Sequence, residues 1–170
     1  MQFQTNKDKV LIVDFGSQVT KLIARRVREI GVYSEIITPK KFKKLKYYND
    51  IKGFIFSGGP STVTATKFET VPKDIFKKKI PVLGICYGFQ LIAKLFGGKI
   101  KSSKKRREFG RAFLFKKRTS LITKKYLNKK KAVWMSHEDA VVKLPKNFKA
   151  IAYTKNSKFT IIENTQDKIY

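Results

Sequence analysis

The single cysteine of the chain, Cys86, lies in the segment V-L-G-I-C-Y-G-F-Q, with a glycine two residues before it and another two residues after it. A continuous apolar run precedes this cysteine, and a segment with helical spacing follows it. A tight strand-to-helix turn lifts one side chain above a sheet, and glycine suits both neighbouring positions because the strained backbone crowds them. The pattern therefore predicts a nucleophile elbow with Cys86 as the nucleophile.

The alternative interpretation of Cys86 is a small apolar residue that ends a core strand. Two glycines flank a given cysteine in this way about once in 200 by chance, at a glycine frequency of about 7%. That rarity, together with the strand before and the helix after, favours the elbow. The helix would begin at the nucleophile, so we expect its dipole to favour the thiolate.

A second glycine segment, S-G-G-P at 57–60, ends the predicted strand that precedes the cysteine strand. The ends of parallel strands lie at the same edge of a sheet, so the amides of Gly58 and Gly59 could face Cys86. Together with the amide of Tyr87 they could form an oxyanion hole. The alternative is an ordinary turn at a strand end. The segment lacks the trailing G-K-[ST] of a phosphate-binding loop.

The elements that must position these residues alternate between strand and helix. Apolar runs and helical spacing predict strands over 9–14, 32–37, 53–57 and 81–86, and helices over 19–30, 74–79 and 87–98. This alternation is typical of a parallel α/β sheet. From Lys99 onward the pattern changes to short strands with little helix between them, over 111–117, 131–136, 149–154 and 158–164.

The predicted fold class is therefore α/β. We expect a mostly parallel, flavodoxin-like open sheet flanked by helices, with an antiparallel β extension in the C-terminal third. No internal repeat or Pro/Gly/Ser-rich linker divides residues 1–170, so we expect one domain. The lysine-rich run at 40–46 is interpreted as a solvated loop or helix face.

The charge of the chain is unusual, with 39 Lys and Arg against 12 Asp and Glu, a net charge of +27. One interpretation is nucleic-acid binding. The other is codon drift in an AT-rich genome, which fits 32 lysines against 7 arginines. We favour drift, because base-reading surfaces favour arginine and the scattered lysines lack the aromatic interleaving of a single-strand binder. We expect no specific nucleic-acid partner.

Two further features bear on the compartment. No apolar run reaches the roughly 18 residues that a membrane span needs, so no membrane partner is expected. A single cysteine cannot form an internal disulfide, which fits a reducing cytoplasm.

Four segments in order carry a family resemblance: V-D-F-G-S-Q-V-T-K-L-I-A-R-R-V-R-E-I-G-V-Y-S-E-I, F-S-G-G-P-S, G-I-C-Y-G-F-Q and V-W-M-S-H-E-D. Together they resemble the class I, triad-type glutamine amidotransferases. The first and third most closely resemble the amidotransferase domain of the GMP synthases. The resemblance covers nearly the whole chain, from about Lys9 to Tyr170.

The resemblance implies a role for each matching position. Cys86 would attack the side-chain amide of glutamine and release ammonia, and Gly59 and Tyr87 would supply the oxyanion-hole amides. The glutamine-binding set would be Gly58, Gln90, Ser136, Glu138 and Asp139. Three positions depart from the family pattern: Val19, Phe89 and Glu138 stand where tyrosine, methionine and glycine are common. At Glu138 a side chain replaces bare backbone.

The single histidine, His137, is the only candidate base in the sequence. The alternative is a turn histidine that packs beside the pocket, and the resemblance favours it. The family's catalytic histidine and glutamate lie in a later G-V-Q-F-H-P-E segment, directly after a K-I-Y-G strand. This chain ends in D-K-I-Y at Tyr170. We therefore expect a domain that is incomplete at its C-terminus, with an uncovered sheet edge and no glutaminase activity in isolation.

The resemblance implies a GMP synthase function: glutamine hydrolysis that supplies ammonia for the ATP-dependent conversion of XMP to GMP in purine biosynthesis. No cofactor is expected in this domain. ATP and Mg²⁺ belong to an ATP-pyrophosphatase domain, in the same or a partner chain, which would also bind XMP. That domain and the dimerisation domain are absent from residues 1–170, and a homodimer is expected to form through the missing part. The alternative is a degenerate, non-catalytic remnant that acts as a binding or scaffold module.

Overall fold

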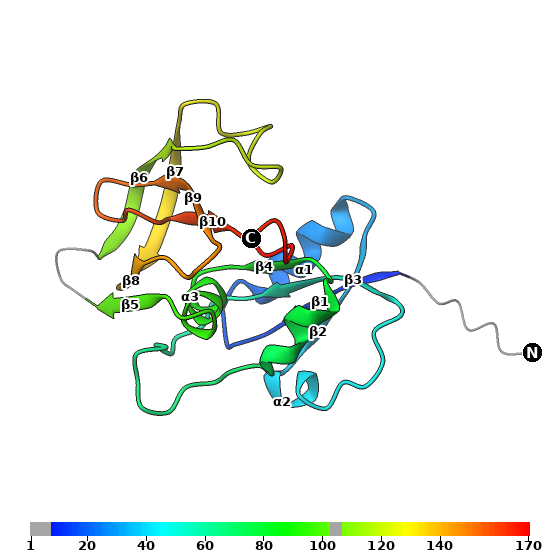
Figure 1. The fold of residues 1–170 in the computed structure, drawn as a ribbon. Helices are drawn as coiled ribbons and strands as arrows, with labels where there is room; N and C mark the ends of the chain where they lie inside the picture. The colour runs from blue at the N-terminus through cyan, green and yellow to red at the C-terminus, as the bar shows by residue number, and fades with distance from the viewer. Residues whose placement is uncertain (1–7, 103–106) are drawn as a thin grey trace, which may run out of the picture.

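A parallel sheet forms the base of the molecule (Figure 1). The computed structural model describes residues 8–102 and 107–170. Four strands lie in the order β2-β1-β3-β4, with bounds Tyr33–Ile37, Lys9–Val13, Ile51–Phe56 and Val82–Gly84. Main-chain groups of Lys168 and Tyr170 pair with the outer edge of β4: the amide of Val82 donates to the Lys168 carbonyl, and that of Gly84 to the Tyr170 carbonyl, both at 2.9 Å. The last three residues of the chain therefore lie along the outer edge of β4.

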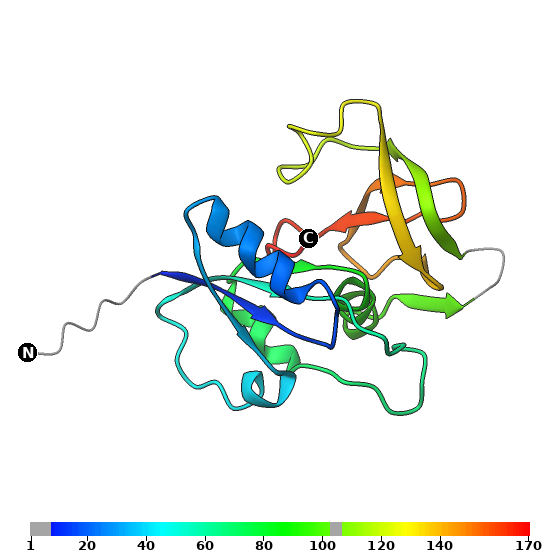
Figure 2. The ribbon, with the colours of Figure 1, turned by 180° about the vertical axis from the view of Figure 1, so that it is seen from behind.

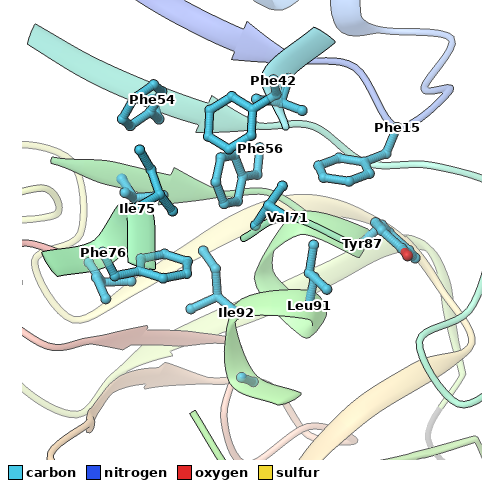
Figure 3. Packing of buried hydrophobic residues seen from close by; sticks show 14 of the residues in the cluster. Phe15, Phe42, Phe54, Phe56, Val71, Ile75, Phe76, Tyr87, Leu91 and Ile92 are labelled. Atoms are coloured by element: carbon cyan, nitrogen blue, oxygen red, sulfur yellow. The ribbon is translucent and has the colours of Figure 1, made fainter. Parts of the chain in front are cut away.

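Helices cover both faces of the parallel sheet. Helix α1, Thr20–Glu29, packs on one face, where Ala24 meets Ile12 and Ile55 (Figure 2). The other face carries α2, η1 and α3, with bounds Pro39–Phe42, Lys73–Lys78 and Tyr87–Leu95. The core on this side is rich in aromatic rings, as Figure 3 shows. Phe56 meets Phe42 and Phe76 edge to face, at centroid separations of 5.7 and 6.2 Å.

The C-terminal third forms an antiparallel sheet beside the parallel one (Figure 1). Its strand order is β10-β9-β6-β7, with bounds Ile161–Glu163, Lys149–Tyr153, Glu108–Lys116 and Lys130–His137. A two-stranded ribbon of β5, Lys99–Ser102, and β8, Asp139–Lys143, runs beside α3. Since β8 begins two residues after β7 ends, the chain turns sharply at Glu138.

The predicted α/β class with an antiparallel extension is confirmed. The sequence did not indicate β5, β8 or α2. In the lysine-rich run the lysines are exposed as expected, but Phe42 is buried in the aromatic core. The short helix expected over 74–79 is the 3₁₀ helix η1. Within the two described ranges, no helix has the length and apolar character that crossing a bilayer requires.

Candidate active site

Cys86 occupies a strained turn between β4 and α3. Its backbone has φ 52° and ψ −107°, a combination with positive φ that non-glycine residues seldom adopt. The amide of Gln90 donates to the Cys86 carbonyl at 3.0 Å, so the helix begins directly after the cysteine. The structure therefore has the strand-turn-helix geometry of an elbow, with the cysteine at its apex.

Close packing explains both flanking glycines. A Cβ on Gly84 would lie 2.8 Å from the amide nitrogen of Phe89, in the first turn of α3. A Cβ on Gly88 would overlap the carbonyl oxygen of Phe56 and lie 2.6 Å from its Cβ. Any side chain at either position would force α3 away from β3 and β4, so these glycines allow the helix to start against the sheet.

The S-G-G-P loop passes directly beside the cysteine. A Cβ on Gly58 would lie 3.4 Å from the Cys86 Cβ, and one on Gly59 would overlap the Phe15 carbonyl oxygen. The buried Ser57 hydroxyl fixes the loop: it accepts from the amide of Phe15 at 3.0 Å and donates to the Gly58 carbonyl at 2.8 Å. The loop is therefore held between β1 and the nucleophile, at the edge expected for parallel strand ends.

The segment 136–139 forms the opposite wall. The Ser136 carbonyl oxygen lies 4.0 Å from the Cys86 sulfur. The side-chain amide of Gln90, which is buried, donates to the Asp139 carbonyl at 3.0 Å. The Asp139 carboxylate accepts a hydrogen bond from the Thr62 hydroxyl. Groups from α3 and from the loop after β3 thus hold this wall in place over the cysteine.

A cavity of about 340 Å³ lies between these walls. Cys86, Gln90, Ser136, His137 and Asp139 line it, and most of its other lining residues are apolar, among them Ile85, Phe89, Val141, Phe159 and Ile162. A mostly apolar pocket with a few convergent polar groups is typical of small-molecule sites. Four predicted site residues therefore meet at one cavity.

Glu138 lies apart from the cavity and is not among its lining residues. Its carboxylate forms an ion pair with Arg107 at 3.0 Å, and its side chain is about half exposed. The side chain that replaces the family's usual glycine is therefore turned toward β6 and away from Cys86.

His137 ends β7 and contacts a buried carboxylate. Its Nε2 lies 3.1 Å from Oε2 of Glu108, which also accepts the Thr154 hydroxyl at 2.9 Å. The Nδ1 atom of His137 is buried and has no hydrogen-bond partner among the residues that the structure describes. Although His137 borders the cavity, its hydrogen bond is directed to Glu108 on β6.

The Cys86 thiol has a raised pKa. Burial of the sulfur among protein atoms is the largest cause, the Tyr87 backbone amide acts in the opposite direction, and the Asp139 charge raises the pKa further. The residue nonetheless keeps an exposed surface at the mouth of the cavity. The amide at the start of α3 acts in the direction expected of a helix N-terminus, but desolvation outweighs it and the pKa of the thiol is raised.

The Tyr87 side chain anchors α3 and stays away from the cavity. It is buried, and its hydroxyl donates to the Glu69 carbonyl. Burial, with the nearby Glu69 charge, raises the pKa of this hydroxyl to about 12. Only the main chain of Tyr87 is therefore available to the site.

Sequence reasoning missed three residues that support the site: Ser57, Thr62 and Glu108. Ser57 and Thr62 flank the G-G-P turn, and hydroxyl side chains near such turns commonly bond to nearby backbone. Glu108 gives no local signal, because its partner His137 lies 29 residues away.

A cysteine elbow at the edge of a parallel α/β sheet, beside a glycine loop and a mostly apolar cavity with a few polar groups, has the geometry of enzymes that use a nucleophilic side chain. Residues 11–170 match the family "Glutamine amidotransferase class-I", and the chain belongs to this family. The GMP synthases [glutamine-hydrolyzing] of Borrelia garinii subsp. bavariensis and Aquifex aeolicus are each 46% identical to it, over 171 and 165 residues. These alignments cover 99% and 95% of this chain but 31% of each relative.

The chain thus spans about a third of the length of these curated relatives, and its resemblance to the amidotransferase domain of GMP synthases is confirmed. Among solved structures, it is similar to a protein from Thermoplasma acidophilum that is described as one subunit of a GMP synthase. The TM-score is 0.79 at 26% identity, covering 95% of this chain and 80% of that one. A glutamine amidotransferase from Thermotoga maritima shares the fold, with TM-score 0.76 at 20% identity, covering 95% and 72%.

Proposed function

We propose that this chain is the glutamine-hydrolysing part of a GMP synthase and uses Cys86 as its nucleophile. The observation that carries the proposal is the position of Cys86, at the apex of a positive-φ elbow, against Gly58 and at the mouth of a mostly apolar cavity with a few convergent polar groups. The names of the 46%-identical relatives support glutamine as the substrate and GMP formation as the use of the ammonia.

The proposed reaction proceeds through a thioester. The Cys86 sulfur attacks the carboxamide carbon of glutamine, and the carbonyl π electrons move to oxygen. The amides of Gly59 and Tyr87 stabilise this oxyanion. When the carbonyl re-forms, the C–N bond breaks and the nitrogen takes a proton and leaves as ammonia. Water then hydrolyses the γ-glutamyl thioester to glutamate and restores the thiol.

The walls of the cavity are assigned to the α-amino and α-carboxylate groups of glutamine. Main-chain groups of 136–139 and the nearby Gln90 and Gly58 would hold these groups. The hydrogen bond of Gln90 to Asp139 and that of Thr62 to the Asp139 carboxylate support this assignment, because they fix the wall before substrate arrives. Glu138 contributes through its main chain alone, since its side chain pairs with Arg107.

Proton transfer is assigned to the histidine and glutamate of the family's G-V-Q-F-H-P-E segment, not to His137. The contact between His137 and Glu108 supports this, because it directs the imidazole to the antiparallel sheet. The thiol's raised pKa supports it as well: nearby groups do not by themselves make a thiolate, so the reaction needs a base.

The remaining partners follow from the same proposal. The ammonia is consumed by an ATP-pyrophosphatase part that binds XMP, ATP and Mg²⁺, in the same or a partner chain, and a homodimer forms through that part. The cytoplasm is the compartment where these nucleotides and a reduced thiol occur together. The support is that the curated relatives are about three times as long as this chain.

A glutamine analogue that carries a chloromethyl ketone in place of the carboxamide tests glutamine recognition without requiring turnover. We expect the L-analogue to alkylate Cys86 once per chain, glutamine to slow the labelling, and Cys86→Ala to abolish it, all read as a mass shift. The D-analogue is the matched control for general thiol reactivity. Equal labelling by both enantiomers, or labelling that glutamine does not slow, would refute the glutamine site and favour a scaffold remnant.

A further inference from the structure

The outer face of the antiparallel sheet carries exposed aromatic rings. Side chains alternate along β6, so Phe109, Arg111, Phe113 and Phe115 share one face. The register places Trp134 opposite Arg111, Lys130 opposite Phe115 on one side, and Tyr153 opposite Phe115 on the other. We call these seven residues the aromatic–cationic face. Trp134 is 80% exposed and Phe109 64%, although both are large apolar side chains.

Cations on this face lie directly over rings. The Lys130 ammonium is 3.9 Å from the centroid of Phe113, and the Arg111 guanidinium is 5.4 Å from the same centroid. Phe115 and Tyr153 stack at 5.5 Å. Positive charge is thus held beside aromatic surface, while Trp134 and Phe109 remain exposed. The cation–π contacts also hold the long basic side chains in place.

Carboxylates are absent from the outward positions of this strand pair. From Phe109 to Phe115 on β6, and from Lys130 to Ser136 on β7, every second residue faces outward and none of them is acidic. Glu108 is buried and bound to His137, and Glu138 at the strand end is paired with Arg107. The face is therefore cationic.

A hollow of about 360 Å³ lies along β6 at this face. Phe109 and Phe113 line it with three cationic residues, Arg107, Arg111 and, from the turn after β9, Lys155. Glu108 also lines it, but this residue is buried and its carboxylate is bound to His137 and Thr154. None of the residues that line this hollow borders the Cys86 cavity, but Trp134 of the aromatic–cationic face does line that cavity. Strand β6 pairs with β9 only at Phe115 and Lys116, so the N-terminal half of this strand is not paired with β9.

We propose that the aromatic–cationic face binds single-stranded nucleic acid without sequence preference. Exposed aromatic clusters mark interaction sites. The outward positions of β6 and β7 combine rings with cations and include no carboxylate, and this combination fits a ligand that has both stacking bases and phosphates. We still attribute most of the +27 charge to codon drift. The sequence alone showed no aromatic residues interleaved with the lysines, but on this face aromatic rings and cations do alternate. This alternation is created by strand pairing, which places Trp134 and Lys130 beside residues of β6 that lie about 15–23 positions earlier.

Trp134 supplies the measurement, because it is the only tryptophan. A mixed-sequence single-stranded 12-mer is titrated into the purified chain while tryptophan fluorescence is followed. We expect quenching, with a log–log salt slope of about −0.7 for each neutralised phosphate. Phe109→Ala should weaken binding by about 5- to 100-fold through lost base stacking. A scrambled sequence should bind equally well.

Matched charge variants separate this face from general basicity. Arg111→Ser with Lys130→Ser removes two cations from the face, and Lys40→Ser with Lys41→Ser removes two exposed cations from α2. We expect the first pair to weaken binding at least about tenfold more than the second, by fluorescence anisotropy of a labelled 12-mer. Equal loss from both pairs would show diffuse attraction and overturn the proposal. Poly-glutamate that binds as tightly as the 12-mer and quenches Trp134 would also overturn it, in favour of an acidic protein partner.

Discussion

Nε2 of His137 lies 3.1 Å from Oε2 of Glu108, and this carboxylate is buried. Glu108 also accepts the Thr154 hydroxyl, so one carboxylate joins β6, the end of β7 and the residue after β9. Because Ser136 and Asp139 lie within two residues of His137, the contact fixes the wall opposite Cys86. We therefore propose a positioning role for the histidine that does not require it to exchange protons with the thiol.

His137→Ala should destabilise the fold more than it affects chemistry. The buried Glu108 would lose one partner, which costs about 1–3 kcal/mol of the free energy of unfolding in urea. Under our proposal that a His-Pro-Glu segment supplies the base, a version of the chain that carries such a segment should release glutamate several orders of magnitude faster than the 170-residue chain. His137→Gln, which keeps a hydrogen-bonding side chain, is the control for stability. Our assignment is wrong if the two versions release glutamate equally and His137→Ala abolishes release by both without unfolding them.

Gly88→Ala should disrupt the elbow. The new methyl group would overlap the Phe56 carbonyl, and overpacking of this kind costs typically about 1–3 kcal/mol, or more where backbone must move. Gly97→Ala is the control, because its Cβ would meet no atom within 4 Å and only the φ of +85° would be strained. Urea denaturation of both variants measures the difference. An equal loss of unfolding free energy in the two variants would show that helix α3 shifts to relieve the contact with Phe56.

The rate at which iodoacetamide alkylates Cys86 should keep rising above the pH at which alkylation of an unstructured cysteine peptide reaches half its maximal rate. We call that pH the midpoint. The thiolate is the reactive form, and a raised pKa lowers its fraction at neutral pH. Asp139→Asn removes a charge that raises the pKa, so its midpoint should shift downward. Mass spectrometry at a series of pH values gives both midpoints. A midpoint at or below that of the peptide would contradict the dominance of desolvation.

Gln90→Ala should loosen the cavity wall. It removes the hydrogen bond that the side chain of Gln90 donates to the Asp139 carbonyl, at a net cost of about 0.5–1.5 kcal/mol. Labelling by the L-chloromethyl ketone should slow, while iodoacetamide labelling of Cys86 stays close to that of the parent chain. If the variant prefers the L-analogue over the D-analogue as strongly as the parent chain does, Gln90 does not shape the glutamine site.

Cys86→Ala should separate the two halves of the proposed reaction. In a preparation joined to the ATP-pyrophosphatase part, glutamine-dependent GMP formation should be lost. Formation from added ammonia should persist, because that chemistry lies in the other part. Cys86→Ser is a second variant with nearly the same volume as the parent. Retained glutamine-dependent turnover in both variants would mean that another residue is the nucleophile.

Much of the site could be predicted from the sequence because its signals are local. The glycines around Cys86 are required by backbone contacts within one strand-turn-helix unit, so their spacing is visible along the chain. The S-G-G-P loop was placed near Cys86 because parallel strands end at one edge. Only β3 and β4 are needed for this, and they are neighbours in the sheet.

The rest depended on contacts between residues far apart in the chain. The raised pKa of Cys86 comes mainly from burial of the sulfur, which depends on its whole surroundings, whereas the effect of the helix N-terminus depends only on local backbone. Glu108 reaches His137, and Thr62 reaches Asp139, across 29 and 77 residues. The sequence by itself determined the elbow, the glycine loop and the fold class, because each follows from periodicity and local backbone strain. Only the tertiary structure decided the cavity wall, the partner of the histidine and the aromatic–cationic face, because strand register and the packing of two sheets create them.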